Sequence, residues 1–166
     1  MCPQRQKSMK KEEDRNPELC KKFVQMGKIA LSQCPELKNE WSIDDDEDHC
    51  ILYIPKVSDD GFDIEVEVNS YGIIVTAEVT HIHFDREDDL EDLCKQALGL
   101  IRDMLSEGMR VLQKESNGKP YRWSIQSNSN GQWITEETSG IFFWNYFGKK
   151  SERIFTNHHL PIRINK

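Results

Sequence analysis

The chain has 166 residues, of which 37% are hydrophobic and 31% charged, and this predicts one globular domain with a core of its own. Aspartate and glutamate total 29 against 22 lysine and arginine, and the net charge of -7 disfavours duplex nucleic acid and anionic membranes as partners. A basic or neutral protein is the favoured partner.

Two features of the sequence predict a cytoplasmic protein. No apolar run approaches the roughly 20 residues of a membrane-spanning helix, and the N-terminal residues lack the apolar segment of a secretory signal. The cysteines form no CxxC pair, so we expect reduced and mostly buried thiols. They are Cys2, Cys20, Cys34, Cys50 and Cys94.

Residues 1–15 are expected to form a disordered polar tail, followed by a single α+β domain over residues 16–166. The first helix is predicted from Asn16, a good N-cap, and Pro17, which suits the first helical position, to Pro35. Five consecutive acids, residues 44–48, form a connector. They do not match a calcium-binding loop, because His49 and Pro55 stand where that loop needs glycine and glutamate.

Residues 50–54 and 62–68 are predicted strands, and the alternation of apolar and acidic residues in the second is strict. Residues 73–85 are expected to form its antiparallel partner. The apolar face of this partner changes sides after Val79, which predicts a bulge near Thr80 or a strand end that leaves the sheet.

A second helix is predicted from a cap at Asp88 or Asp89 to Gly108, with a wide apolar stripe. A hairpin with its turn at Asn117 and Gly118 follows, and then two or three further strands. The predicted fold is α+β, in the order α-β-β-β-α-β-β-β(-β), with both helices on one face of a mostly antiparallel sheet.

The stretch THIHFD, residues 80–85, holds the first candidate site. Alternation on a strand places His81, His83 and Asp85 on one side, where they form a polar rim of a binding surface or ligate a zinc or iron ion. The other ligands of known metallohydrolase motifs are absent. The sequence therefore favours solvated rim residues and predicts no metal and no cofactor, with the metal-dependent hydrolase as the alternative.

The second candidate site is the aromatic and basic segment near the C-terminus. It consists of Trp144, Tyr146, Lys149, Lys150 and Arg153. Exposed aromatic and basic side chains are preferred anchors of protein interfaces, and they can also stack single-stranded nucleic acid, which the acidic net charge disfavours. The adjacent histidines His158 and His159 match no motif.

No catalytic residues are predicted. Ser116 and Lys119 have the spacing of a serine–lysine nucleophile pair, but the Asn-Gly between them indicates a turn and not the helix start that this chemistry needs. Neighbouring strand residues point apart, so His49 does not activate Cys50.

The strand ending in HIHFD, the helix DLEDLCKQALGLIRDMLSEG and the hairpin rich in Lys, Arg and Trp, over about residues 70–126, resemble a pattern in small uncharacterised bacterial proteins. Some of these are similar to immunity proteins that neutralise polymorphic toxins. The resemblance implies a cytoplasmic, non-enzymatic protein that masks a toxin.

The sequence therefore predicts a non-enzymatic protein-binding module. Besides the metal-dependent hydrolase, a second alternative is a small acidic secretion-type chaperone, which would be a dimer.

Overall fold

Two helices and nine strands form the part of the chain that the computed structural model describes, residues 17–86, 89–140 and 148–157. The helices are α1 (Glu18–Leu31) and α2 (Leu90–Met104). The first five strands are β1 (Glu40–Ile43), β2 (Cys50–Ile54), β3 (Ile64–Asn69), β4 (Gly72–Ala77) and β5 (Thr80–Asp85). The last four are β6 (Met109–Ser116), β7 (Lys119–Ser129), β8 (Gln132–Gly140) and β9 (Lys150–Phe155).

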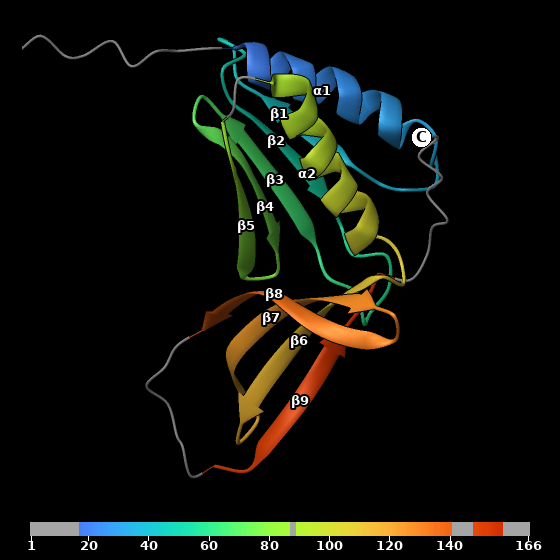
Figure 1. Cartoon of the computed structure of the whole chain (residues 1–166), viewed down its shortest axis with the longest axis vertical. Coiled ribbons are helices and arrows are strands. Elements are labelled where there is room, and N and C mark those ends of the chain that lie inside the picture. Colours follow the sequence, from blue (N-terminus) through green and yellow to red (C-terminus); the bar gives the residue numbers. More distant parts are fainter. Residues whose placement is uncertain (1–16, 87–88, 141–147, 158–166) are drawn as a thin grey trace, which may run out of the picture.

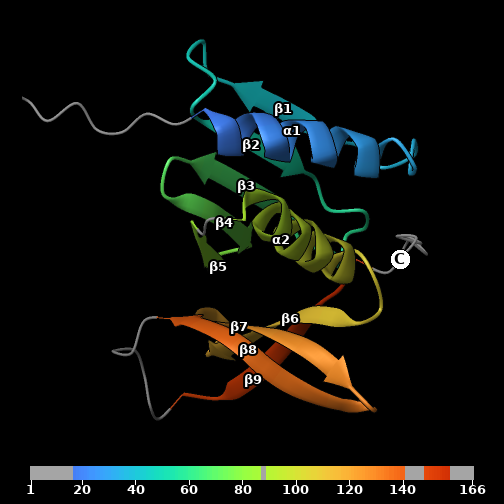
Figure 2. The same cartoon turned by 45° about the horizontal axis from the view of Figure 1, so that its top comes forward.

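The first five strands form one antiparallel sheet in chain order, and both helices lie on the same face of it (Figure 1, Figure 2). Alternate residues of the central strands point toward the helices and are buried, as the alternation in the sequence predicts. They join the apolar stripes of α1 and α2 in one hydrophobic cluster. Burial of this cluster is the main stabilising contribution to the fold.

Helix α1 packs closely on the edge strand β1 because Gly27 has no side chain. A Cβ atom at Gly27 would lie 2.7 Å from the Trp41 ring. Trp41 packs in turn against Phe23, with the ring centroids 6.0 Å apart, and donates a hydrogen bond from Nε1 to Asn39 Oδ1 at 3.2 Å. The edge strand is therefore held to the helix layer by one aromatic side chain.

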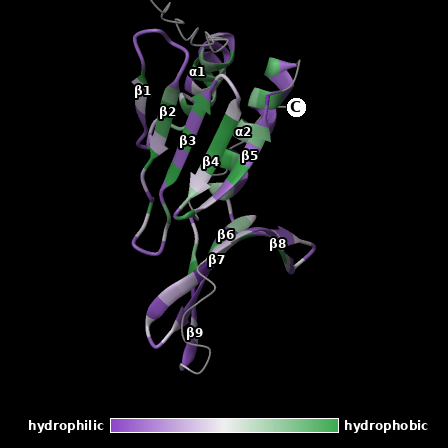
Figure 3. Cartoon of the chain, turned by 90° about the vertical axis from the view of Figure 1, so that its left-hand side faces the viewer, coloured by the Kyte–Doolittle hydropathy of each residue, from purple (hydrophilic) through white to green (hydrophobic). Residues whose placement is uncertain are grey.

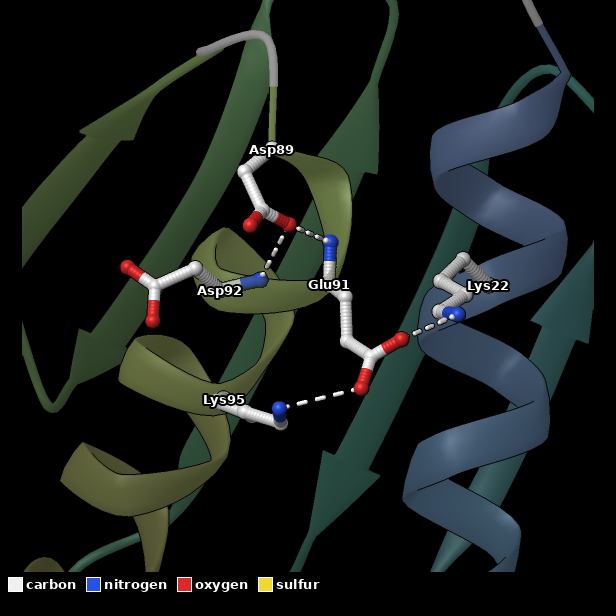
Figure 4. A network of polar contacts seen from close by, with 5 residues as sticks. All are labelled: Lys22, Asp89, Glu91, Asp92 and Lys95. Atoms are coloured by element: carbon white, nitrogen blue, oxygen red, sulfur yellow. Dashed lines mark hydrogen bonds and ion pairs between the residues drawn. The ribbon is translucent and has the colours of Figure 1, made fainter.

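The start of α2 is fixed by polar contacts (Figure 4). The Asp89 side chain accepts hydrogen bonds from the backbone N–H groups of Glu91 and Asp92, both at 3.0 Å, as expected of an N-cap. Glu91 also forms ion pairs with Lys22 of α1 at 2.8 Å and with Lys95 at 3.0 Å. These lysines lower the pKa of Glu91 to about 2. The two helices are thereby linked at their exposed edges.

The other four strands form a second antiparallel sheet, in the order β8-β7-β6-β9. Both of its tight turns are Asn-Gly pairs with positive φ, at residues 117–118 and 130–131. Much of this sheet is hydrophilic (Figure 3). Its contribution to the hydrophobic cluster is the buried set Met109, Val111, Ile125 and Phe155.

The end of β9 is tied to the loop between β2 and β3. Asn157 is only 1% exposed; its Oδ1 accepts from the Phe62 N–H at 3.2 Å, and its Nδ2 donates to the Phe62 carbonyl at 2.9 Å. The Thr156 N–H donates to the Asp60 carbonyl at 2.8 Å. Gly61 makes room for this clamp, because a Cβ there would lie 2.6 Å from Asn157 Oδ1.

The α+β class, the antiparallel pairing, the Asp89 cap and the Asn117–Gly118 turn are confirmed. The cysteines Cys20, Cys34, Cys50 and Cys94 are free and buried, as expected. Neither helix in the described part of the chain is long and apolar enough to cross a membrane. The tail over residues 1–15 and the predicted cap Asn16 lie outside the described residues.

Three expectations about the strands were wrong. Residues 73–85 form two strands, β4 and β5, joined by a two-residue turn at Glu78 and Val79, and this turn causes the change of apolar face. Residues 40–43 form β1, which the sequence did not predict. The strands form two sheets and not one. In addition, α2 ends at Met104, before Gly108.

Replacement of Gly27 by alanine should destabilise the protein by about 1–3 kcal/mol, because the new methyl group collides with Trp41 and overpacking outweighs the gain in helix propensity of about 1 kcal/mol. Urea denaturation measures the change. Gly99→Ala in α2 is the matched control: a Cβ there meets nothing within 4 Å, so that variant should be slightly stabilised. Equal effects of the two substitutions would contradict the close packing.

Replacement of Asn157 by alanine should cost about 2–4 kcal/mol of unfolding free energy, because it leaves both buried backbone groups of Phe62 without their partner. Asn128→Ala removes a comparable side chain, whose Oδ1 accepts from the Gly131 N–H, from an exposed turn and should cost less than half as much. A loss for Asn157→Ala no larger than that of the control would show that the clamp is not needed to hold the two sheets together.

Candidate functional site

The face of the five-stranded sheet that points away from the helices is the main candidate surface. Strand register aligns its side chains in two rows across the sheet. One row consists of Glu40, Tyr53, Glu65, Thr76 and His81, and the next of Ser42, Ile51, Glu67, Ile74 and His83. These ten residues, with Asp85 at the end of β5, are called the open face below.

His81, His83 and Asp85 are exposed on this face, while Ile82 and Phe84 point the other way and pack against the hydrophobic cluster. The orientation expected from the sequence is therefore present, although a hairpin turn produces it. The two imidazole rings lie edge to face with their centroids 4.8 Å apart.

The geometry of this group does not favour a metal centre. Within the described residues, no set of three or more His, Cys, Asp or Glu side chains is placed so that it could hold a metal ion. The alternative ligand set of His81, His83 and Asp85 is thus not assembled.

Acidic side chains carry the formal charge of the open face and of the loop beside it. Glu40, Glu65 and Asp85 are exposed, and Glu67 lies 3.5 Å from His49 Nε2. His49 Nδ1 also lies 3.3 Å from Asp44, the first acid of the loop between β1 and β2. The histidine links the acidic loop to the open face, and if protonated it offsets part of their charge.

The open face is not uniformly polar. Tyr53, Ile51 and Ile74 are half-buried and lie between the acidic and histidine side chains of the two rows. Partly exposed aromatic and aliphatic side chains ringed by charges are typical of protein interfaces. The arrangement therefore suits a protein surface better than a small substrate.

The basic candidates lie elsewhere. Lys149 and Lys150 adjoin the β6–β7 turn, where the Lys149 carbonyl accepts from the Asn117 N–H at 2.9 Å. Strand β9 is one edge of the second sheet, whereas β5 contacts β8 and β7 at the other side. The structure thus does not bring Lys149 and Lys150 next to His81 and His83.

Arg153 lies closer to the junction of the two sheets. Burial raises the pKa of Glu78, in the β4–β5 turn, and Asp63 adds to this rise, while Lys56 and Arg153 oppose it. Arg153 also lies over the Phe155 ring, 4.8 Å from its centroid. Trp144 and Tyr146 fall outside the described residues, as do His158 and His159.

The two halves of the chain differ in charge, a feature that the overall composition conceals. Residues 17–108 contain 22 acidic against 8 basic residues, whereas residues 109–166 contain 4 against 9. This difference in charge can be read from the sequence, but only when the charged residues are counted separately for the two halves. Ile51 and Tyr53 were also missed, because only the register shows that they share a face with His81 and His83.

No protein-family model matches this chain, and the searches of curated proteins and of solved structures found no match either. The chemistry of the open face is therefore the basis for assigning a function.

Replacement of both His81 and His83 by alanine should cost under about 1 kcal/mol of unfolding free energy, because both side chains are exposed. Ile82→Ala on the same strand, which removes a side chain packed against the cluster, should cost more, about 2 kcal/mol. Urea denaturation compares them. Elemental analysis should find no stoichiometric metal; zinc, iron or manganese that is lost in the double variant would support the hydrolase instead.

Proposed function

We propose that this chain is a non-enzymatic, cytoplasmic protein-binding module whose open face binds a basic protein. The segregation of charge carries the proposal: residues 17–108 have an excess of 14 acidic residues, from 22 against 8, and four of these acids, Glu40, Glu65, Glu67 and Asp85, lie on the open face. Such a surface attracts a basic partner and repels nucleic acid. A toxin that itself binds nucleic acid presents a basic surface of this kind, so an immunity protein is the specific form proposed.

The half-buried Ile51, Ile74 and Tyr53 supply the apolar part of the contact. Exposed ion pairs are worth about 0.2–1 kcal/mol each, so charges alone would give a fast but weak complex. Burial of a few hundred Å² of apolar surface adds several kcal/mol at about 25 cal/mol per Å². His81 and His83 lie at the β5 end of the same rows.

A tagged chain should recover one dominant basic protein from its native host. The double charge reversal of Glu40→Lys with Glu65→Lys should weaken binding of that protein roughly 5- to 30-fold, as two exposed pairs at about 0.5–1 kcal/mol each imply. Isothermal titration calorimetry with the purified partner measures the change.

The matched control reverses two exposed acids outside the open face, Glu36→Lys with Glu107→Lys, which changes the net charge equally. It should keep most of the affinity. An equal loss in both variants would mean that only net charge matters. Recovery of no partner, together with measurable turnover of a small-molecule substrate, would count against a binding module altogether.

A further inference from the structure

The basic end of the second sheet is not used by the proposed function. It is formed by Lys114, Lys119, Arg122, Lys149 and Lys150, on β6, β7, β9 and the turns beside them. Lys119, Arg122, Lys149 and Lys150 are exposed. Within this group, Lys114 forms an ion pair with Glu152 at 3.3 Å, and Lys150 Nζ donates a hydrogen bond to Ser116 Oγ at 3.2 Å.

The basic end and the acidic loop lie at opposite ends of the molecule. The β6–β7 turn and the start of β9 are at the end farthest from the helices, while the β1–β2 loop lies at the helix-bearing end (Figure 1, Figure 2). The chain therefore has an acidic and a basic pole along its long axis. At physiological salt, electrostatic interactions are screened beyond about 8 Å. The charge of each end of the molecule therefore influences which surfaces come into contact more than the net charge of the whole chain does.

Two aromatic side chains of the second sheet, Trp133 and Tyr121, each have a cation over the ring. The Arg110 guanidinium lies over the Trp133 ring, 4.0 Å from its centroid, and Lys150 lies 4.8 Å from the centroid of Tyr121. Arg110 is also held by Gln126, whose Oε1 accepts from Nε at 2.8 Å. Bases of single-stranded nucleic acid stack on uncovered aromatic faces, and at the basic end Lys150 already occupies one face of Tyr121, so the exposed cations there suit carboxylates better than nucleobases.

We propose that two copies of this chain associate with their long axes antiparallel, so that the basic end of each copy contacts the open face of the other. The acidic surface that complements the basic end is present on the same chain, in Glu40, Glu65, Glu67 and Asp85. A two-fold arrangement makes both contacts at once and closes the assembly, whereas a single head-to-tail contact would continue into a filament.

The magnitudes predict a weak and salt-sensitive dimer. Four exposed ion pairs per contact at about 0.2–1 kcal/mol each, formed twice by symmetry, sum to about 2–8 kcal/mol, which corresponds to a dissociation constant between the micromolar and millimolar ranges at low salt. One consequence rests on the proposed function: the second copy would cover the open face until a more basic partner displaces it. The self-association itself requires no other protein.

Sedimentation velocity of the full purified chain tests the proposal with reciprocal charge reversals. The wild type should dimerise at low salt and dissociate at about 0.5 M NaCl, where screening is nearly complete. Lys119→Glu with Arg122→Glu should be monomeric, because two acidic surfaces would meet. Glu40→Lys with Glu65→Lys should be monomeric for the opposite reason. All four side chains are exposed, and circular dichroism checks that each variant is folded.

An equimolar mixture of the two variants should restore the dimer. In the mixed dimer, one contact joins a wild-type basic end to a wild-type open face. The other contact joins the acidic variant end to the basic variant open face, so its charges are again opposite. Restoration would support the antiparallel contact in a way that a general loss of stability cannot imitate. A monomeric wild type at low salt, dimers that survive either reversal, or a mixture that stays monomeric would each overturn it. So would a monomer that binds a poly(A) oligonucleotide through Lys119 and Arg122. None of these measurements involves the partner of the proposed function.

Discussion

The hydrogen bonds between the Asn157 side chain and the Phe62 backbone hold the two sheets of this protein together. They satisfy the buried N–H and carbonyl groups of Phe62 in the β2–β3 loop, and Gly61 leaves the space that they need. The second sheet contributes few side chains to the hydrophobic cluster, so apolar burial holds it only at one end. A buried polar clamp thus lets a hydrophilic sheet extend from a hydrophobic one.

This division explains why the two halves carry opposite charge. The first sheet is stabilised by a helix-covered core, and the acids of its open face, Glu40, Glu65, Glu67 and Asp85, take no part in that core. The second sheet relies instead on paired strands, Asn-Gly turns and polar contacts such as Ser124 with Thr138, and its exposed side chains include the cations Lys119, Arg122, Lys150 and Arg153. The two surfaces proposed for binding, the open face and the basic end, therefore lie outside the hydrophobic cluster that stabilises the fold.

The sequence predicted those features that are determined by neighbouring residues and that the tertiary packing does not alter. The Asp89 cap, the Asn117–Gly118 turn and the outward orientation of His81 and His83 are examples. The β4–β5 hairpin was missed because Glu78 and Val79 have no turn preference, and Glu78 adopts a φ of 57° only because the sheet pairs the strands on either side. Strand β1 and the division into two sheets depend on contacts distant in sequence, as does the assembly of the open face, and no local pattern encodes these.

The salt dependence of binding to the basic partner tests the central claim most directly, because it separates an electrostatic contact from a purely apolar one. If the acidic open face governs recognition, the dissociation constant should rise at least about tenfold between 50 and 300 mM NaCl, and this rise should be smaller in the Glu40→Lys, Glu65→Lys variant. A dissociation constant that does not change with salt, or that rises equally in the variant, would contradict the assignment of the open face as the binding surface.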